Sequence, residues 1–172
     1  MEDAFADLLE ANARYAAGEH HVAETGVARK GLAIVTCIDS RIDPLAVFGL
    51  EPGDAKILRN AGARVTDDVE RGLALAAAAL GVTRIAVVQH TDCKLTDASE
   101  AELVAAVGKA TGRPRPVGFD PLAIDDQPAA LANDVSRLLE STLLPAGTVV
   151  TGLVYDLRSG RLDTVVEPAV TG

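Results

Sequence analysis

The sequence is poor in aromatic side chains and has no excess of basic ones. Aromatic residues make up only 3% of the chain, and tryptophan is absent. The formal net charge is -9, and no block of lysine or arginine interrupts the acidic background. An acidic surface repels phosphate backbones, and so few rings cannot build a platform on which bases stack. We therefore do not expect nucleic acid as a partner.

A long apolar run and a basic leader are also missing. The chain starts with Met1-Glu2-Asp3-Ala4-Phe5, which is acidic and unlike a signal peptide. The longest apolar stretch, residues 73–80, is too short to span a bilayer. We therefore expect no membrane association and a cytoplasmic location. The hydrophobic share of 48% predicts one packed globular domain over residues 1–172.

Cysteine is scarce as well, with only Cys37 and Cys93 in the chain. In a reducing cytoplasm, two such cysteines more often serve catalysis or metal binding than a disulfide. Taken alone, however, a buried cysteine is most simply a small core residue. The surroundings of each cysteine must decide between these readings.

Apolar periodicity predicts strands that alternate with helices. Buried strands are expected at residues 32–36, 56–59, 84–89 and 148–155, with a returning strand at 161–166. Helices are expected at residues 2–18, at 44–48, from a cap at Asp67 or Asp68 to residue 80, from the capping box Ser99-x-x-Glu102, and around 131–139. This alternation predicts an α/β fold with a mainly parallel sheet.

The first chemical motif, Cys37-Ile38-Asp39-Ser40-Arg41, begins where the first predicted strand ends. If the backbone stays extended, Cys37, Asp39 and Arg41 point to one side. The carboxyl ends of parallel strands are where open α/β sheets place their ligands. The simpler alternative is that Asp39 and Arg41 form an ordinary exposed ion pair.

The second motif, His90-Thr91-Asp92-Cys93, begins where the third predicted strand ends, at the same edge of a parallel sheet. A tight turn can bring the imidazole and the thiol to one metal ion. Together with Cys37, they give two sulfurs and one nitrogen, a ligand set that suits Zn²⁺. Three protein ligands leave a fourth position open, which is typical of a catalytic site.

These motifs together resemble the paired signature of the β-class carbonic anhydrases, in particular the small bacterial branch. The segments Ile57-Leu58-Arg59-Asn60-Ala61-Gly62 and Val65-Thr66-Asp67-Asp68-Val69 are similar to that family's sequence between the motifs. The resemblance covers residues 31–166, with residues 1–30 as an N-terminal helical arm.

The resemblance implies a four-stranded parallel sheet with an added antiparallel strand and helices on both faces. It also implies an N-terminal helix that packs on a partner subunit, in a homodimer or tetramer. Zinc would be held by Cys37, His90 and Cys93, and the catalytic dyad would be Asp39 and Arg41. In closed forms of family members, the aspartate of this dyad becomes the fourth zinc ligand. Arg41 would prevent this by holding Asp39.

The activity implied is the reversible, zinc-dependent hydration of carbon dioxide to bicarbonate. Relatives hydrolyse carbonyl sulfide or carbon disulfide with the same zinc ligands, so that activity is an alternative. One residue departs from the family pattern, because Lys94 stands where glycine usually follows the second cysteine. A zinc-binding relative with impaired catalysis is therefore a further alternative.

Overall fold

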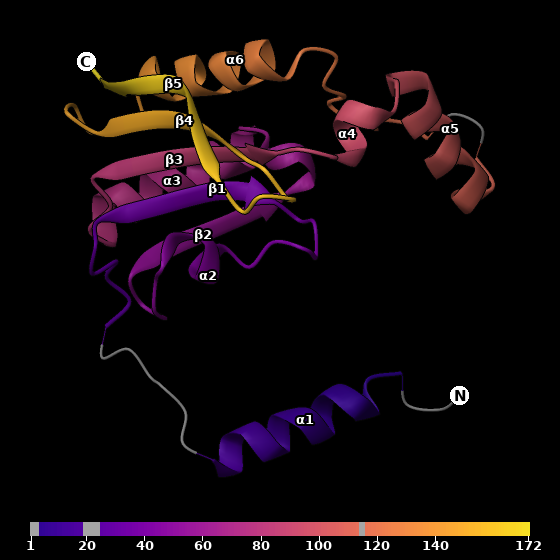
Figure 1. Ribbon diagram of the computed structural model, residues 1–172, viewed down its shortest axis with the longest axis horizontal. Helices are drawn as coiled ribbons and strands as arrows, with labels where there is room; N and C mark the ends of the chain where they lie inside the picture. Colours follow the sequence, from indigo (N-terminus) through magenta and orange to yellow (C-terminus); the bar gives the residue numbers. More distant parts are fainter. Residues whose placement is uncertain (1–3, 19–24, 114–115) are drawn as a thin grey trace.

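The computed structural model describes residues 4–18, 25–113 and 116–172. Five strands and the helices around them form an α/β fold (Figure 1). The strands are β1 (Leu32–Cys37), β2 (Ala55–Asn60), β3 (Arg84–His90), β4 (Val149–Tyr155) and β5 (Leu162–Val170). The helices are α1 (Ala6–Ala17), α2 (Pro44–Phe48), the 3-10 turn η1 (Ala61–Ala63), α3 (Asp67–Ala79), α4 (Lys94–Asp97), α5 (Glu100–Thr111) and α6 (Gln127–Leu139).

The sheet has the strand order β2-β1-β3-β4-β5. The first four strands in this order pair in parallel, and β5 runs antiparallel to β4, so the predicted fold class is confirmed. The chain leaves β1 toward β2 on one side and later returns to add β3 on the other side. The carboxyl ends of β1 and β3 therefore border the switch point of the sheet, where open α/β sheets bind ligands.

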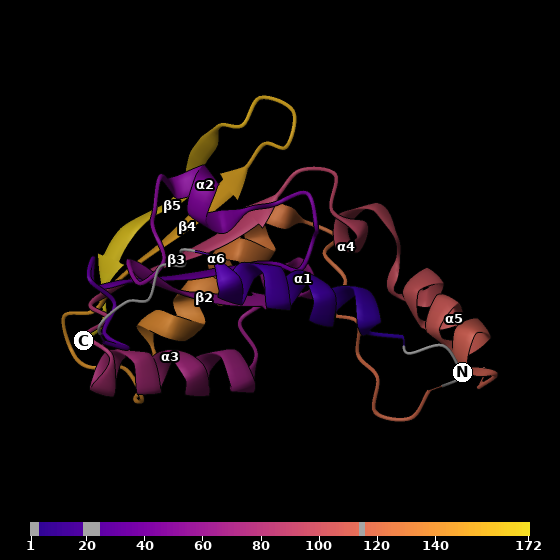
Figure 2. The same cartoon turned by 90° about the horizontal axis from the view of Figure 1, so that it is seen from below.

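Both faces of the sheet are covered, but unequally. One face packs against α3 and α6 through the largest buried cluster, which includes Val35, Leu73, Val87 and Leu131. The opposite face carries a smaller cluster around Ile34 and the short helix α2 (Figure 2). Because alternate side chains of a strand point to opposite faces, β1 and β3 supply both clusters. The central strands are thereby fixed, and so are the residues at their ends.

Most predicted helix ends agree with the structure, with one correction. The capping box Ser99-x-x-Glu102 is present at the start of α5. The cap of α3 is Thr66, whose hydroxyl accepts a hydrogen bond from the Val69 backbone N–H, and the prediction of Asp67 or Asp68 was wrong. Threonine is itself a good N-cap. It leaves both aspartates in the first turn, where their negative charges interact favourably with the positive end of the helix dipole.

The predicted N-terminal helix forms as α1, but it begins at Ala6, because residues 4 and 5 form a turn. Residues 2 and 3 of the prediction lie outside the described part of the chain. None of the residues of α1 is buried, and the helix lies apart from the sheet (Figure 1). No helix within the described residues has the length and apolar character needed to cross a membrane.

Glu70 joins α3 to α6 and carries our first testable prediction. Its carboxylate accepts hydrogen bonds from Arg137, at 3.1 and 2.9 Å, and from the Ser141 hydroxyl. The Ser141 hydroxyl and then the Arg137 guanidinium lower the pKa of Glu70. A carboxyl whose pKa is lowered by folding stabilises the protein above its ordinary pKa, and this contribution disappears as the pH falls through the lowered value.

We therefore expect Glu70→Gln to lower the free energy of unfolding at pH 7 by about 1–2 kcal/mol, as for a lost hydrogen bond to a charged group. The deficit should shrink as the pH falls below roughly 4.3, the ordinary pKa of glutamate. Urea unfolding at several pH values measures both effects. Asp68→Asn, in an exposed ion pair on the same helix, is the control. An equal deficit at pH 7 and pH 3 would contradict this assignment.

Candidate metal centre

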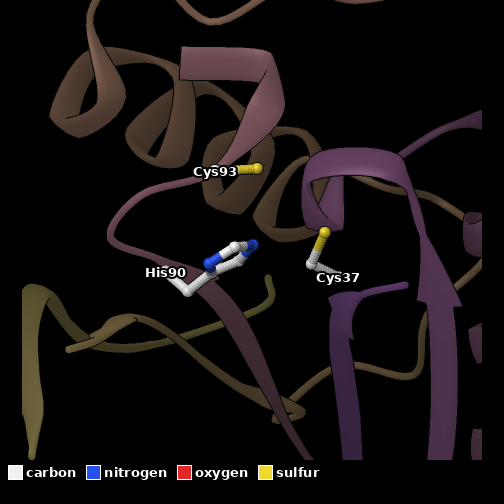
Figure 3. Close-up of side chains that lie close together, drawn as sticks. All are labelled: Cys37, His90 and Cys93. Atoms are coloured by element: carbon white, nitrogen blue, oxygen red, sulfur yellow. The ribbon is translucent and has the colours of Figure 1, made fainter. Parts of the chain in front are cut away.

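Three donor side chains converge at the carboxyl edge of the sheet (Figure 3). Cys37 is the last residue of β1, His90 is the last residue of β3, and Cys93 follows three residues later. Their ligand atoms all lie within 4.8 Å of one another, and all three residues are buried. The prediction that the two motifs meet at one edge of the sheet is confirmed.

The imidazole of His90 is oriented by its own backbone neighbour. Its Nδ1 lies 2.8 Å from the carbonyl oxygen of Thr91. A carbonyl only accepts hydrogen bonds, so Nδ1 carries the proton and Nε2 presents a lone pair. Among the described residues, Nε2 is one of three buried side-chain atoms without a hydrogen-bond partner. A buried nitrogen lone pair left unpaired beside two thiols fits a metal ion of the zinc type.

A tight turn brings Cys93 back beside His90. Asp92 adopts a left-handed conformation with φ 54°, which is uncommon for a residue other than glycine. The Cys93 carbonyl then accepts hydrogen bonds from the backbone N–H groups of Thr96 and Asp97, which hold the turn in place. The left-handed conformation of Asp92 thus turns the backbone so that two ligands three residues apart can face the same point.

The sulfur of Cys37 is positioned by a backbone group of η1, the turn that follows β2. The backbone N–H of Gly62 lies 3.4 Å from its sulfur. Gly62 has φ 74°, and a Cβ at this position would come within 2.7 Å of a Leu95 methyl carbon. The left-handed backbone conformation therefore favours glycine, and the Leu95 side chain would have to move to admit a Cβ.

The two thiols depend on each other for their protonation. The hydrogen bond from Cys93 lowers the pKa of Cys37. The pKa of Cys93 is raised in turn, first by its bond to Cys37 and then by burial. One thiolate therefore forms readily, and the second requires a cation. Metal binding at such a pair releases protons and is consequently favoured by rising pH.

Asp39 and Arg41 form a two-pronged ion pair at the edge of the ligand cluster. Arg41 Nε donates to one carboxylate oxygen at 2.9 Å, and Nη2 donates to the other at 2.7 Å. These bonds hold the pKa of Asp39 well below its usual range. Asp39 Oδ2 lies 3.9 Å from His90 Nε2, so the carboxylate reaches the cluster while it stays bound to Arg41.

The expected geometry of this motif was wrong in one respect. The backbone does not stay extended after Cys37 but turns, and the N–H of Ile42 donates to the carbonyl of Asp39 at 3.1 Å. The turn folds Arg41 back onto Asp39, whose carboxylate also accepts the backbone N–H of Arg41. Arg41 further donates to the Asp92 carbonyl at 2.9 Å and so ties the two motifs together.

Arg59 is a supporting residue whose role the sequence did not indicate. It donates to the backbone carbonyls of Cys37, at 2.8 Å, and Asp39, at 2.7 Å. It therefore holds both ends of the segment that carries the first ligand and the carboxylate. The signal lies in the strand register, since β1 and β2 pair Thr36 with Arg59. Gln127, at the start of α6, supports the second ligand in a similar way, because its Nε2 donates to the carbonyl of His90 at 3.0 Å.

A cavity of about 280 Å³ opens beside the two cysteine donors. Its lining combines the two sulfurs with apolar side chains and two charged ones. The lining residues are Cys37, Ile38, Asp39, Ala61, Cys93, Lys94 and Leu95. A mostly apolar cavity of this size admits a small uncharged molecule to the ligand cluster.

Comparison with known proteins places these residues in a family context. The family model described as carbonic anhydrase matches residues 32–112, which include all three donors and the Asp39–Arg41 pair. The chain is 33% identical over 136 residues to β-carbonic anhydrase 1 of Mycobacterium bovis, a match that covers 79% of this chain and 82% of that protein.

Solved and curated relatives extend the comparison. The crystal structure of a carbonic anhydrase from Streptococcus mutans matches with a TM-score of 0.84 and 34% identity, covering 96% of this chain and 99% of that one. A carbon disulfide hydrolase of Acidianus sp. is 29% identical over 153 residues, covering 76% of this chain and 75% of that protein. The similarity thus includes proteins named for two different substrates.

Proposed function

This chain belongs to the β-class carbonic anhydrases, and on that basis we propose that its Cys37–His90–Cys93 centre binds one zinc ion for the reversible hydration of carbon dioxide to bicarbonate. One observation carries the proposal. The unpaired Nε2 of His90 and the two cysteine sulfurs lie within 4.8 Å of one another in a buried cluster (Figure 3). Two thiolates and one imidazole are a preferred zinc ligand set.

Zinc, when bound, acts as a Lewis acid that makes water a nucleophile near neutral pH. The chain's own residues prepare the site for it. The Thr91 carbonyl keeps the His90 lone pair directed at the two sulfurs, and the Gly62 N–H fixes the Cys37 sulfur. Three protein donors leave room for solvent in the fourth position, as a catalytic site requires.

Asp39 is proposed to orient the attacking water. Because its pKa is held low, the carboxylate stays ionised at neutral pH and can only accept hydrogen bonds. A water that donates to Asp39 has its lone pair free to attack the carbon of carbon dioxide. Arg41 occupies both carboxylate oxygens and so keeps Asp39 from becoming a ligand itself.

The cavity is proposed to hold carbon dioxide beside this water. Ile38, Ala61 and Leu95 provide apolar walls for an uncharged linear molecule.

Similarity to a carbon disulfide hydrolase makes the substrate the point to test. We expect purified, zinc-loaded protein to hydrate carbon dioxide much faster than it hydrolyses carbon disulfide or carbonyl sulfide. Stopped-flow pH-indicator assays of the first and sulfide release from the other two, run on the same preparation, make the comparison. Hydrolysis of a sulfur substrate without hydration of carbon dioxide would assign the alternative activity, and loss of all three would indicate a zinc protein without catalysis.

We further propose that the chain forms a homodimer or larger assembly through α1. Phe5, Leu8, Leu9 and Tyr15 of this segment are 58–64% exposed. An apolar stripe of this kind on a helix that buries none of its residues in its own chain suits a surface on a second copy.

We expect removal of residues 1–18, or the double change Leu8→Asp and Leu9→Asp, to convert the assembly to monomers. Sedimentation velocity measures the change, and Glu10→Gln on the same helix is the matched control. A shortened chain that kept the full-length oligomer would rule out this role of α1.

We propose a cytoplasmic location on chemical grounds. Both cysteines are free in the structure, and the proposed site requires both as thiolates. A reducing compartment keeps them available for zinc.

A further inference from the structure

Lys94 is the one cationic side chain that lines the cavity beside the donors. It directly follows Cys93 and begins the short helix α4. The side chain is exposed, and within the described residues no carboxylate lies in ion-pair distance of its ammonium group. Lys94 is thus a cation at the mouth of the cavity that is not held by a direct partner.

The one carboxylate of the cavity lining is not available to pair with Lys94. Asp39, the other charged residue of the lining, is paired on both oxygens with Arg41. Two thiolates with one Zn²⁺ sum to zero. The Glu102 carboxylate interacts electrostatically with Lys94, and it accepts hydrogen bonds from the backbone N–H and the hydroxyl of Ser99. Within the described part of the chain, Lys94 is therefore a cation of the lining that no ion pair occupies, and Glu102 offsets its charge only from outside the lining.

This local charge opposes the character of the whole molecule. The chain has a net charge of -9, which disfavours the approach of any anion. The negative potential of the protein does not affect uncharged carbon dioxide, whereas it repels bicarbonate as this anion approaches. A cation at the cavity mouth compensates where the anion passes.

We propose that Lys94 binds the bicarbonate anion at the cavity mouth and thereby sets the affinity of the site for small monovalent anions, but not for carbon dioxide. The inference rests on the proposed function. It makes Lys94 a determinant of how strongly the site retains bicarbonate, which is the substrate of dehydration and the product of hydration.

Kinetics in both directions provide the test. We expect Lys94→Gln to raise the KM for bicarbonate and the kcat of dehydration together, each about 5- to 10-fold, the effect of one charge at contact distance in a partly screened site. The ratio kcat/KM should stay within about twofold in both directions, because a variant cannot change the equilibrium between carbon dioxide and bicarbonate. Lys94→Arg should restore the wild-type KM for bicarbonate. The wild-type value should increase with ionic strength, whereas that of Lys94→Gln should change little. Lys109→Gln, a lysine near the end of α5, is the matched control.

Binding of an unreactive anion separates this inference from the proposed function. Calorimetric titration of zinc-loaded protein with thiocyanate should show about fivefold weaker binding for Lys94→Gln, in line with the kinetic effect. If the wild type failed to hydrate carbon dioxide but this difference remained, the proposed function would fail and the anion site would stand. Equal thiocyanate affinity and an equal KM for bicarbonate in wild type and Lys94→Gln would overturn the inference.

Discussion

Replacing Cys93 with alanine is expected to remove zinc from the protein and, with it, nearly all hydration of carbon dioxide. The change leaves Cys37 and His90 as the only members of the buried donor cluster found among the described residues. Two ligands do not hold zinc tightly at neutral pH, where protons compete for the remaining thiolate. We expect a loss of activity greater than the roughly 10- to 100-fold typical of changes to residues that support a metal ligand.

The folded state must be checked separately, because Cys93 is only 3% exposed and its removal leaves a small void. Cys93→Ser keeps the volume and is the companion variant, and circular dichroism reports whether each variant folds. Thr96→Val, which replaces the hydroxyl bonded to the Cys93 carbonyl with a methyl group, is the control for disturbance of the turn. A folded Cys93→Ala protein with a full complement of zinc would show that Cys93 is not a ligand.

The second large effect is expected for Arg41→Ala, which should lower activity about 10- to 100-fold while zinc content stays near wild type. Arg41 is not a proposed ligand, but it holds both oxygens of Asp39 and the carbonyl of Asp92. Without it, Asp39 is free to turn toward the metal position. Arg71→Ala removes a similar exposed arginine–aspartate pair on α3 and should have no effect on activity.

The pH dependence of the Arg41→Ala activity tests the role of the Asp39–Arg41 pair more specifically. The Arg41 guanidinium lowers the pKa of Asp39, so the wild-type pair persists above that lowered value and is lost only as the pH falls through it. In the variant, the pKa of Asp39 should return toward its ordinary value of about 3.9. The residual activity should therefore decline on the acid side at a higher pH than in the wild type. Wild-type activity of Arg41→Ala from mildly acidic to alkaline pH would refute the dyad mechanism.

Much of the site could be predicted because its residues lie at the ends of apolar strands. The parallel arrangement of β1 and β3 brings Cys37 and His90 to one edge, and the strand pattern alone predicts this. The turn after Cys37 was not predictable in the same way. It depends on hydrogen bonds of the Asp39 carbonyl and carboxylate, which compete locally with the extended backbone.

Other features depend on contacts between distant parts of the chain. Arg59 supports the site only because β2 pairs with β1 in one particular register, and no local pattern fixes that register. The cap of α3 shows a different difficulty, because Thr66 stands next to two aspartates that are equally suitable caps. The apolar stripe of α1 is evident in the sequence, but helical periodicity does not indicate which surface covers it.

Metal analysis of the wild-type protein, purified without added metal, tests the central claim most directly. We predict about one zinc per chain, because two soft thiolates and one imidazole select this ion. Iron in place of zinc, or a folded protein without metal, would contradict the account.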